Sequence, residues 1–577
     1  MNIKKILYKT IIQSFEKIGI NKKYDPIISR TNTEYRGQYQ ANGIIKISKI
    51  EKKDPKKLSN KIINLIKSKK IFKKVFYTKP GFINFIINPE WISEKLNIIL
   101  KKNNLHIKKK KKETIVIDYS SPNIAKEMHI GHLRSTVLGD SFAKLASFLG
   151  HKVIKVNHIG DWGTNFGIIL AFYKEKKINL SNLTKNLKNI EKHYIIAKKK
   201  FDNDKKFANL SQKYNLKLNK NNINCKKIWK KIVSYSIKKN NVIYKKLNIS
   251  LKNKHIKGES AYHHMLPEII EDLLKKKIAK KIDGSVVVIL KKFKNRIGKP
   301  MGIIIQKKDS SFLYSTIDIA CLKYRCSILN ANRIIYYTDS RQSQYLQQII
   351  LIAKMAGYIP NNTIIEHHTF GMVLSKNNKP FKTRDGNNIK LIHLIKEAEK
   401  RAYSITKTKN SNLKPKEIIS ISKKIGIGSI KYSDLSKNRI TNYIFDWKTM
   451  LTFEGNTAPY MQYTFTRITS IFNKISYDIK KIKYPIILLE KYETELSLKI
   501  LQFEEIIDES FKKGYMHLLC LYLYNLSVHF SIFYEQCPIL KNSNKKIKYS
   551  RIKLCFLTST ILKIGLKILG IPTINFM

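Results

Sequence analysis

The chain has 577 residues, enough for three or four domains of ordinary size. Hydrophobic residues make up 43% and charged residues 26%, which excludes a disordered polyampholyte. The 111 basic residues outnumber 41 acidic ones, and the formal net charge of +70 indicates a polyanionic partner such as nucleic acid, phosphate or an anionic membrane.

Two explanations of this charge stay open. Only 12 of the basic residues are Arg and 99 are Lys, and Ile and Asn are also abundant. Drift toward A/T-rich codons would leave the same composition on solvated faces. Because sites that read bases prefer Arg and aromatic side chains, the Lys excess argues only for attraction to phosphates.

The cysteines and the apolar runs indicate the cellular compartment of the protein. The six cysteines form no CxxC pair and no histidine pair completes a zinc spacing, so we expect buried thiols in a reducing compartment and no protein-bound structural metal. Residues 1–20 carry Lys and Glu at helical spacing and predict a domain helix rather than a signal peptide. No apolar run is long enough to span a membrane, so we expect a cytoplasmic protein without a membrane partner.

The N-terminal region, residues 1–110, mixes helical periods with short strands. Residues 79–88 predict a turn followed by a strand that carries aromatic side chains. Five consecutive lysines at 108–112 mark the boundary of this α/β domain. They fit either a solvated linker or a contact with phosphates.

A strand–helix–strand pattern follows. A β-rich run at 114–119, apolar residues at helical spacing over 133–149 and a second β-rich run at 152–157 predict a βαβ unit and hence a parallel sheet. Strands at 333–338 and 363–369 flank a helix at 342–356. We interpret the Lys/Asn-rich, helix-biased region of about 175–295 as an insertion in this Rossmann-like domain, residues 111–411.

The strands are expected to stop after residue 412. The helical patterns of this region predict an all-α domain, residues 412–577, with helices at 418–437, 456–475, 488–513 and 516–534. The fold class is therefore α/β, with a parallel-sheet domain between an α/β domain and a helical domain.

The chemistry is concentrated in residues 120–132, between a predicted strand and the start of a helix. A doubly wound sheet binds phosphate-bearing ligands at such a position, because unpaired amides and the helix dipole face the crevice. Gly131 allows close approach of a nucleotide, and His129 and His132 can donate hydrogen bonds to phosphate oxygens as charge grows on them.

Residues 122–135, PNIAKEMHIGHLRS, resemble the HIGH signature of class I aminoacyl-tRNA synthetases, and more closely the arginyl-tRNA synthetases. Further segments similar to that family follow in the expected order, at 157–163, 336–342, 366–372, 433–439 and 453–463. The resemblance extends from Phe82 to Met577. It implies activation of L-arginine with ATP and Mg²⁺, release of pyrophosphate and transfer of arginine to tRNA(Arg).

The resemblance also implies an arginine site. A planar guanidinium needs a fork of acceptors, and Tyr314 and Asp318 lie four residues apart at a predicted helix start, on one face. The implied arginine contacts are Asn123, Tyr314, Asp318 and Gln342, with Asp118 or Ser121 nearby. Because such a site rejects lysine strongly, we expect no editing domain.

The ATP-binding loop is less regular. Residues 379–386, KPFKTRDG, match the family's KMSKS-type loop, but Thr383 stands where its second lysine is usual. The charge can come from Lys376, Lys379, Lys382 or Arg384, and which lysine serves the loop stays open. The resemblance places His368, Phe370 and Met372 around the adenine.

The outer domains are expected to bind tRNA. Phe82 and Asn84 lie two apart on a strand, so that one can stack on a base and the other can read it. Tyr460, Tyr463 and Arg467 share a helical face suited to unstacked anticodon bases, and the terminal Met577 is a further expected contact.

We therefore expect a monomeric ligase of this family. Three alternatives are a class I synthetase for another amino acid, a small-molecule nucleotidyltransferase and a catalytically inactive RNA-binding relative. The Tyr314 and Asp318 pair argues against a synthetase for another amino acid. The length of the chain argues against a small-molecule enzyme, and the intact His129 and His132 argue against an inactive relative.

Overall fold

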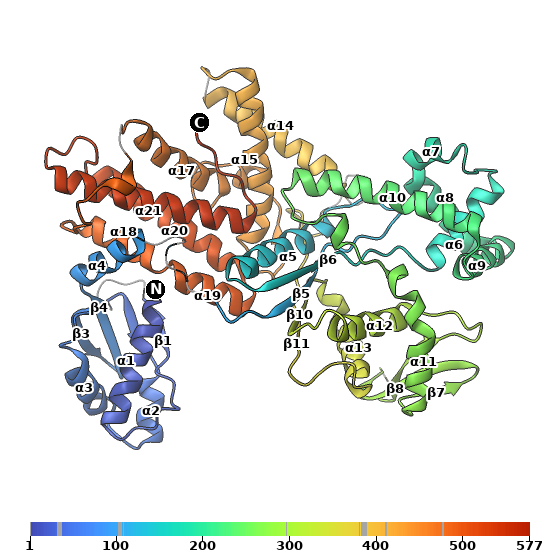
Figure 1. Cartoon of the computed structure of the whole chain (residues 1–577), viewed down its shortest axis with the longest axis horizontal. Coiled ribbons are helices and arrows are strands. Elements are labelled where there is room, and N and C mark those ends of the chain that lie inside the picture. Colours follow the sequence, from blue (N-terminus) through green and yellow to red (C-terminus); the bar gives the residue numbers. More distant parts are fainter. Residues whose placement is uncertain are drawn as a thin grey trace. The chain divides into compact units, whose positions relative to one another are not determined.

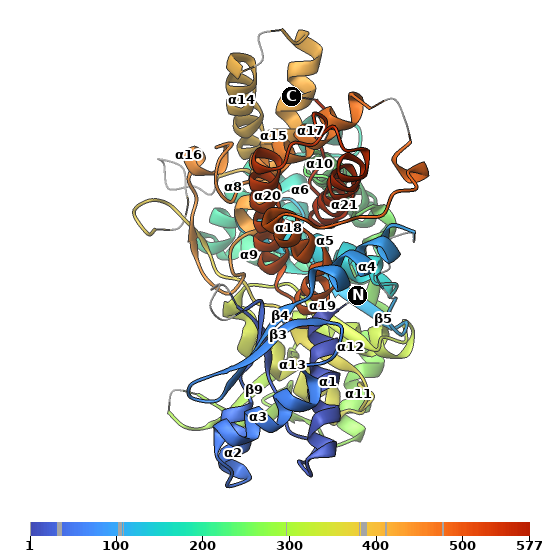
Figure 2. The same ribbon diagram turned by 90° about the vertical axis from the view of Figure 1, so that its left-hand side faces the viewer.

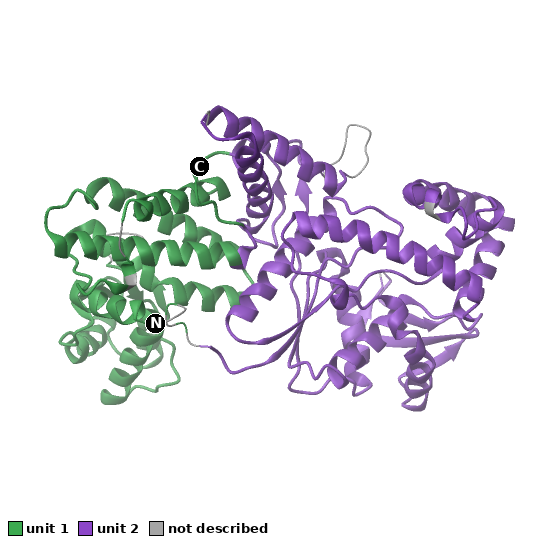
Figure 3. Cartoon of the chain, turned by 45° about the horizontal axis from the view of Figure 1, so that its top comes forward, with its two compact units in different colours: residues 1–108, 452–567, 572–577 green, residues 109–451, 568–571 purple. Residues whose placement is uncertain are grey.

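The computed structural model describes all residues except 1, 32–36, 102–104, 106, 108, 296, 380, 382–388, 410–411, 476–477 and 577. The chain forms two compact units (Figure 3). Unit 1 comprises residues 1–108, 452–567 and 572–577, and unit 2 comprises residues 109–451 and 568–571.

Unit 1 contains an antiparallel sheet in the strand order β1-β2-β4-β3. The strands are β1 (Ile28–Arg30), β2 (Tyr39–Ala41), β3 (Phe72–Thr78) and β4 (Phe82–Ile87), and the helices of this part are α1 (Ile3–Lys17), α2 (Ile44–Ile50), α3 (Pro55–Ile66) and α4 (Pro89–Leu100). The apolar stripe of α3 packs against β3 and β4 (Figure 1). The strand expected after the turn at residue 79 is β4.

The rest of unit 1 is helical. Its helices are α17 (Ala458–Asn473), η7 (Ile479–Lys481), α18 (Lys491–Leu501), α19 (Phe503–Lys513), α20 (Met516–Gln536) and α21 (Lys545–Leu569). The stretch 488–513, expected as one helix, is two. The break is at Gln502, whose N–H bonds to the carbonyls of both Leu498 and Lys499, each at 3.1 Å, so the last turn of α18 is tightened.

Helix α20 is the one described helix whose length and composition would allow it to cross a membrane. Half of its apolar window is buried, and it packs against α17, α18 and α19. Figure 2 shows it beside α18 and α21. This packing is that of the core helix of a bundle.

Unit 2 is built on a four-stranded parallel sheet in the order β11-β10-β5-β6, which confirms the sheet type predicted from the βαβ pattern. Its strands are β5 (Thr114–Asp118), β6 (Lys152–Val156), β10 (Arg333–Tyr336) and β11 (Ile364–His367), with the helices α5 (Gly131–Phe148), α12 (Tyr314–Ser327) and α13 (Ser343–Met355). Asp118 pairs with Tyr336, and Tyr336 pairs with His367, so the carboxyl ends of three strands lie at one edge. Strand β6 lies on one side of β5 and β10 lies on the other, so the direction in which strands are added reverses at β5. A ligand crevice is expected at such a switch point.

The region between β6 and α12 is only partly helical. Its elements are α6 (Thr164–Glu175), α7 (Leu183–Asn186), η3 (Leu187–Asn189), α8 (Ile190–Asn203), α9 (Lys205–Asn219), α10 (Ile223–Lys246), η4 (Asn253–His255), η5 (Glu259–Met265), α11 (Leu266–Lys275), β7 (Ala279–Ile282), β8 (Ser285–Lys294) and β9 (Pro300–Gln306). The expected helical bias fails after residue 278, where β7, β8 and β9 form an antiparallel sheet. Asp283 and Gly284 both have positive φ, 46° and 78°, in the Asp-Gly hairpin turn that joins β7 to β8.

Unit 2 continues to residue 451, beyond the boundary expected at 411. Its last elements are η6 (Ser340–Gln342), β12 (Val373–Leu374), α14 (Leu391–Lys409), α15 (Pro415–Leu435), β13 (Tyr443–Ile444) and α16 (Trp447–Met450). Helix α15 packs against α14 and α5, and β13 pairs in parallel with β12. The expectation that strands stop at 412 is therefore wrong, because β13 completes a pairing with a strand 70 residues earlier.

Candidate active site

The loop after β5 is held in a strained conformation. Ser120 and Ser121 both have positive φ, 72° and 43°, a backbone conformation that residues other than glycine rarely adopt. The Ser120 N–H donates to Ser135 Oγ at 2.9 Å, and the Ser121 N–H donates to Asn157 Oδ1 at 3.0 Å. Bonds to α5 and to the residue after β6 thus fix the wall of the crevice.

His129 and His132 lie together at the start of α5, with ring centroids 4.2 Å apart. His132 Nδ1 accepts the His129 N–H at 3.2 Å, and His129 Nδ1 accepts the Gly131 N–H at 3.1 Å. Because both Nδ1 atoms are acceptors, each neutral ring carries its proton on Nε2.

Burial keeps both rings neutral at pH 7. It lowers the pKa of His129, and burial together with the neighbouring His129 lowers the pKa of His132 to about 4. Two neutral Nε2–H donors at a helix N-terminus are suited to stabilise charge that develops on a phosphate. Gly131 also leaves room for the His129 ring, since a Cβ at this position would lie 2.8 Å from that ring and would displace it.

A cavity of about 450 Å³ opens beside this loop. Asn123 and Tyr314, two of the predicted arginine contacts, line it. A third polar residue that lines the cavity is Glu259, at the start of η5, which was not predicted from the sequence. Burial and the nearby carboxylates of Asp318 and Asp161 raise the pKa of Glu259 to about 8. A site that holds carboxyl groups this close together stabilises an incoming cation.

Asp318 is a partly buried carboxylate on α12. Its Oδ2 accepts a hydrogen bond from Tyr345 Oη, and its Oδ1 lies 3.9 Å from His158 Nε2. Burial raises its pKa, against the lowering effect of His158 and of the Tyr345 hydrogen bond. Tyr314 stands one turn earlier, 61% exposed, with its ring 5.2 Å from that of Tyr345. Tyr314 and Asp318 thus both contact Tyr345, but only Tyr314 is among the residues that line the cavity.

Asp118 is already paired with an arginine of the protein. Its Oδ2 lies 2.5 Å from Arg325 Nη2, and Arg325 is completely buried. The other oxygen accepts from Ser121 Oγ at 2.8 Å, and Ser121 Oγ in turn accepts the His158 N–H at 3.0 Å. In this conformation Asp118 and Ser121 position the crevice loop and do not line the cavity. Gln342 is also absent from the cavity lining and is exposed in η6.

The residues expected around the adenine lie after β11. His368 is buried with both ring nitrogens bonded, Nδ1 to Tyr337 Oη at 3.0 Å and Nε2 to Glu366 Oε2 at 2.7 Å. Although burial raises the pKa of Glu366, hydrogen bonds from His368 and Arg333 lower it to about 2.

The two neighbours of His368 differ in exposure. Phe370 is buried, whereas Met372 is 40% exposed and its N–H donates to Asn442 Oδ1 at 2.7 Å. Of the three residues, Met372 therefore has the side chain most accessible to a ligand.

The segment after the lysine-rich loop is tied to the histidine segment. The Ile130 N–H donates to the Ile389 carbonyl at 2.9 Å, and the Leu391 N–H donates to the Met128 carbonyl at 2.9 Å. Lys390 Nζ lies 2.8 Å from both Glu127 Oε2 and Glu191 Oε2. Lys379 is exposed at the end of a turn in which its carbonyl accepts the Ser375 N–H. Lys382 and Arg384 lie outside the described residues.

Comparisons with known proteins identify the family of this chain. The family profile described as tRNA synthetases class I (R), catalytic domain, matches residues 95–447. Profiles of the arginyl tRNA synthetase N terminal domain and the DALR anticodon binding domain match residues 1–87 and 461–577. The chain belongs to the arginyl-tRNA synthetase family.

The synthetase has curated relatives along its whole length. It is 53% identical over 577 residues to the arginine–tRNA ligase of Buchnera aphidicola subsp. Acyrthosiphon pisum (strain Tuc7), and 46% identical over 578 residues to that of Haemophilus influenzae (strain 86-028NP), with complete coverage of both chains in each case. The crystal structure of Plasmodium falciparum arginyl-tRNA synthetase matches with a TM-score of 0.83 and 30% identity, covering 100% of this chain and 99% of that chain. The Thermus thermophilus enzyme shares the fold, with a TM-score of 0.81, 20% identity and complete coverage of both chains.

In unit 1 of the synthetase, the two residues expected on one strand differ in exposure. Asn84 has no exposed surface, and its side chain accepts from Gln40 Nε2 and donates to Thr78 Oγ1, both at 2.8 Å. Its amide supports the sheet in this conformation. Phe82 is partly exposed at the start of β4.

The three residues predicted to stack on anticodon bases, Tyr460, Tyr463 and Arg467, all lie on α17. Arg467 Nη2 donates to Tyr463 Oη at 3.1 Å, and its guanidinium carbon lies 4.9 Å from the Tyr463 ring and 5.2 Å from the Tyr534 ring of α20. Tyr463 and Tyr534 are 38% and 40% exposed. Tyr460, partly buried, bonds to Ser531 at 3.3 Å. Tyr534 was not predicted, because only tertiary packing brings α20 beside α17. Met577 lies outside the described residues.

The cysteines and the side chains that could bind a metal ion complete the description of the site residues. All six cysteines of the synthetase are buried free thiols. Within the described part of the chain, no three His, Cys, Asp or Glu side chains are grouped as metal ligands would be.

Proposed function

We propose that this chain is an arginine–tRNA ligase that joins L-arginine to tRNA(Arg) and, in doing so, converts ATP to AMP and diphosphate. The observation that carries the proposal is that the loop after β5 brings Asn123 to a cavity lined by Glu259 and continues to the paired histidines His129 and His132 at the start of α5. The family membership and the full-length relatives support the same reaction.

Arginine enters the cavity with its guanidinium toward the carboxylates of Glu259 and Asp318. A guanidinium presents five N–H donors in a planar fork, so two carboxylates on one side can accept more bonds from it than from an ammonium. Asn123 and Tyr314, on the cavity wall and rim, would hold the rest of the amino acid. Gln342 is a proposed contact only after a movement of η6, since it does not line the cavity in this conformation. Asp118 and Ser121 act through the loop that they position.

Activation needs no protein nucleophile. An oxygen of the arginine carboxylate attacks the α-phosphorus of ATP in line, the bond to the bridging oxygen breaks, and pyrophosphate leaves with the electron pair. The Nε2–H groups of His129 and His132 donate to the phosphate oxygens as charge grows on them. Mg²⁺ arrives with ATP as part of the substrate complex.

The lysine-rich loop supplies further positive charge to the phosphates. Lys379 is the described lysine of this loop, and Lys382 and Arg384 remain proposed partners. Gly131 permits close approach of the nucleotide, and Phe370 and Met372 border the adenine with His368 behind them. The pairing of residues 389–391 with 128–130 anchors one end of this loop to the histidine segment.

Transfer follows when a terminal ribose hydroxyl of tRNA attacks the carbonyl of the adenylate and AMP leaves. Tyr463, Arg467 and Tyr460 would stack on anticodon bases, Met577 is a further contact, and Phe82 and Asn84 belong to the surface proposed for the D-loop side. We also propose that the enzyme is cytoplasmic, since six buried free thiols fit a reducing compartment, and that it acts as a monomer.

ATP–pyrophosphate exchange tests the function. The assay compares arginine with lysine, each with and without total tRNA. We expect exchange with arginine and not with lysine, and only when tRNA is present. The dependence on tRNA is inferred from the family. A folded enzyme that binds tRNA but exchanges with no amino acid would refute the ligase and leave the RNA-binding alternative.

A further inference from the structure

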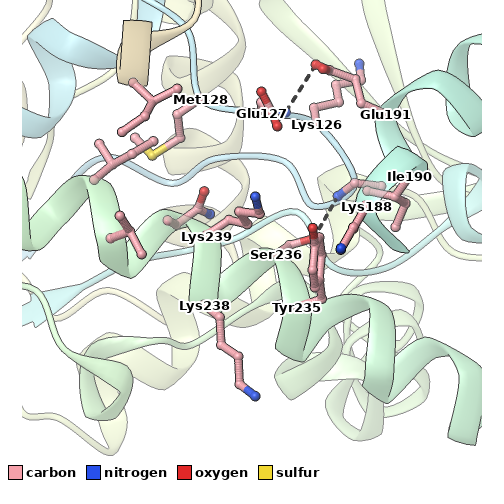
Figure 4. A pocket seen from close by; sticks show the side chains of 15 residues that line it. Lys126, Glu127, Met128, Lys188, Ile190, Glu191, Tyr235, Ser236, Lys238 and Lys239 are labelled. Atoms are coloured by element: carbon pink, nitrogen blue, oxygen red, sulfur yellow. Dashed lines mark hydrogen bonds between the residues drawn. The ribbon is translucent and has the colours of Figure 1, made fainter. Parts of the chain in front are cut away.

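A second cavity, of about 380 Å³, lies behind the segment that leads to the two histidines (Figure 4). One wall is formed by residues 125–128 and the facing wall by α8 and α10. The size is within the range of pockets that bind small organic molecules. None of the predicted substrate-binding residues lines it.

The inner surface of this cavity is mainly apolar. Its apolar lining consists of Ala125, Met128, Ile190, Val242, Ile243 and Ile392. Met128 is only 1% exposed, whereas Val242 is 52% exposed and stands where the cavity meets solvent. Such a surface favours a compact apolar or aromatic body.

The polar part of the lining is positively charged. Lys126, Lys188 and Lys239 border the cavity, and among the described residues none of them has a carboxylate within 4.0 Å. Lys126 and Lys239 instead lie over the rings of Tyr194 and Tyr235, at 5.0 and 5.7 Å. In Figure 4 the Lys239 side chain points toward the cavity, whereas the Lys238 ammonium points away from it.

The two acidic side chains of the lining offset only part of this charge. Glu127 and Glu191 share a single cation, Lys390, at 2.8 Å, so these three groups together carry one net negative charge against the positive charges of Lys126, Lys188 and Lys239. The cavity therefore presents an excess of ammonium groups without a carboxylate partner around an apolar interior, and its complement is an anion.

Hydrogen bonds connect the cavity wall to residues 125–128, the segment that leads to His129 and His132. Ala125 has a φ of 66°, strained for a residue with a Cβ, and its N–H donates to Ser236 Oγ on α10 at 3.3 Å. The Glu127 N–H donates to Glu191 Oε1 on α8 at 3.2 Å. Both bonds are drawn in Figure 4 and hold the segment from the cavity side, at positions four and two residues before His129.

We propose that this cavity is a binding site for a small amphipathic organic anion, with an apolar or aromatic body and one carboxylate, sulfonate or phosphate group. The body lies against Met128 and Val242, and the anionic group lies among Lys126, Lys188 and Lys239. A bound molecule alters the hydrogen bonds to Ala125 and Glu127 and so changes the rate of arginine activation. The binding site does not depend on the proposed function, whereas the effect on rate does.

The test uses the full-length enzyme and 1-anilinonaphthalene-8-sulfonate, a fluorescent aromatic sulfonate. Titrations are made with saturating arginine and ATP, so that the catalytic cavity is occupied. Val242→Trp fills the mouth of the cavity from an exposed position and should abolish saturable binding. Lys239→Glu should weaken binding by about tenfold, because a charge-assisted bond is replaced by repulsion. Lys230→Glu makes the same charge change on α10 at an exposed position outside the lining and should leave binding within about twofold.

The outcomes separate the possible explanations. Binding that survives in both Val242→Trp and Lys239→Glu, or that arginine and ATP displace, would overturn the site. Displacement by total tRNA in stoichiometric amounts would assign the cavity to RNA instead and overturn the small-anion proposal.

Pyrophosphate exchange provides the second readout. Saturating dye should change the exchange rate of the wild type by at least about twofold and leave Val242→Trp unaffected. Binding without this change would overturn the coupling alone. Absence of exchange before any dye is added would refute the proposed function and leave the binding result intact.

Discussion

Arginine binding should be strongly linked to pH through Glu259. Because burial and the carboxylates of Asp318 and Asp161 raise the pKa of this side chain to about 8, it is mostly protonated at pH 7 in the unliganded enzyme. A guanidinium stabilises the ionised form, so binding releases the proton. Affinity must therefore rise with pH until the pH passes the pKa.

The magnitude follows from a single titrating site. If only ionised Glu259 binds, the measured Kd exceeds its limiting value by about 100-fold at pH 6, about tenfold at pH 7 and about twofold at pH 8, for a pKa of about 8. Arginine affinity should thus increase by about 50-fold between pH 6 and pH 8. At pH 7 about 0.9 proton should leave for each arginine bound.

Isothermal titration calorimetry measures both quantities. Kd is determined at pH 6, 7 and 8, and at pH 7 in phosphate and in Tris, whose different ionisation enthalpies reveal the number of protons released. Glu259→Gln is the matched control, because it keeps the shape but cannot ionise. This variant should bind weakly, with little dependence on pH and no proton release through this residue. A wild-type Kd that is constant from pH 6 to pH 8, with no proton exchanged, would refute the assignment of Glu259 as a guanidinium partner.

Three other changes test separate parts of the structure. His132→Ala removes an Nε2–H donor and should lower kcat of pyrophosphate exchange by about 100- to 1,000-fold with a smaller effect on the KM for arginine, whereas a loss confined to KM would contradict a role in the transition state. Asp118→Asn leaves the buried Arg325 without its carboxylate and should reduce the free energy of unfolding by about 3–5 kcal/mol in urea denaturation; an unchanged midpoint would show that the pair does not stabilise the fold. Tyr463→Ala should raise the Kd for tRNA by about tenfold in filter binding with an unchanged KM for arginine, and equal affinity would exclude this ring from the RNA surface.

The excess of lysine over arginine leads to a measurement on the wild type. If these lysines contact phosphates, the logarithm of the tRNA association constant should fall steeply with the logarithm of salt concentration, by about 0.7–0.9 for each phosphate neutralised. A slope near zero would favour compositional drift as the origin of the charge.

The sequence by itself determined the elements whose signals are contiguous in the chain. The run at 114–119, the apolar spacing of 133–149 and the His129–His132 segment predicted β5, α5 and the crevice between them, because strand and helix periods and a helix start are local properties. The same holds for Tyr314 and Asp318, which share a helix face. The Asp283-Gly284 hairpin was equally legible and was missed because the surrounding lysines suggested helix.

Tertiary structure alone decided which polar groups meet across long separations. Glu259 lies beside Asn123 and Tyr314 only after the chain between β6 and α12 has folded back on the crevice, and no local pattern distinguishes it from a solvated acid. Asp118 is held by Arg325, 207 residues later, and Asn84 is buried by Gln40 of a neighbouring strand. The reason is physical: a helix or strand period follows from local geometry, whereas the partner of a buried charge is set by packing and desolvation of the whole domain.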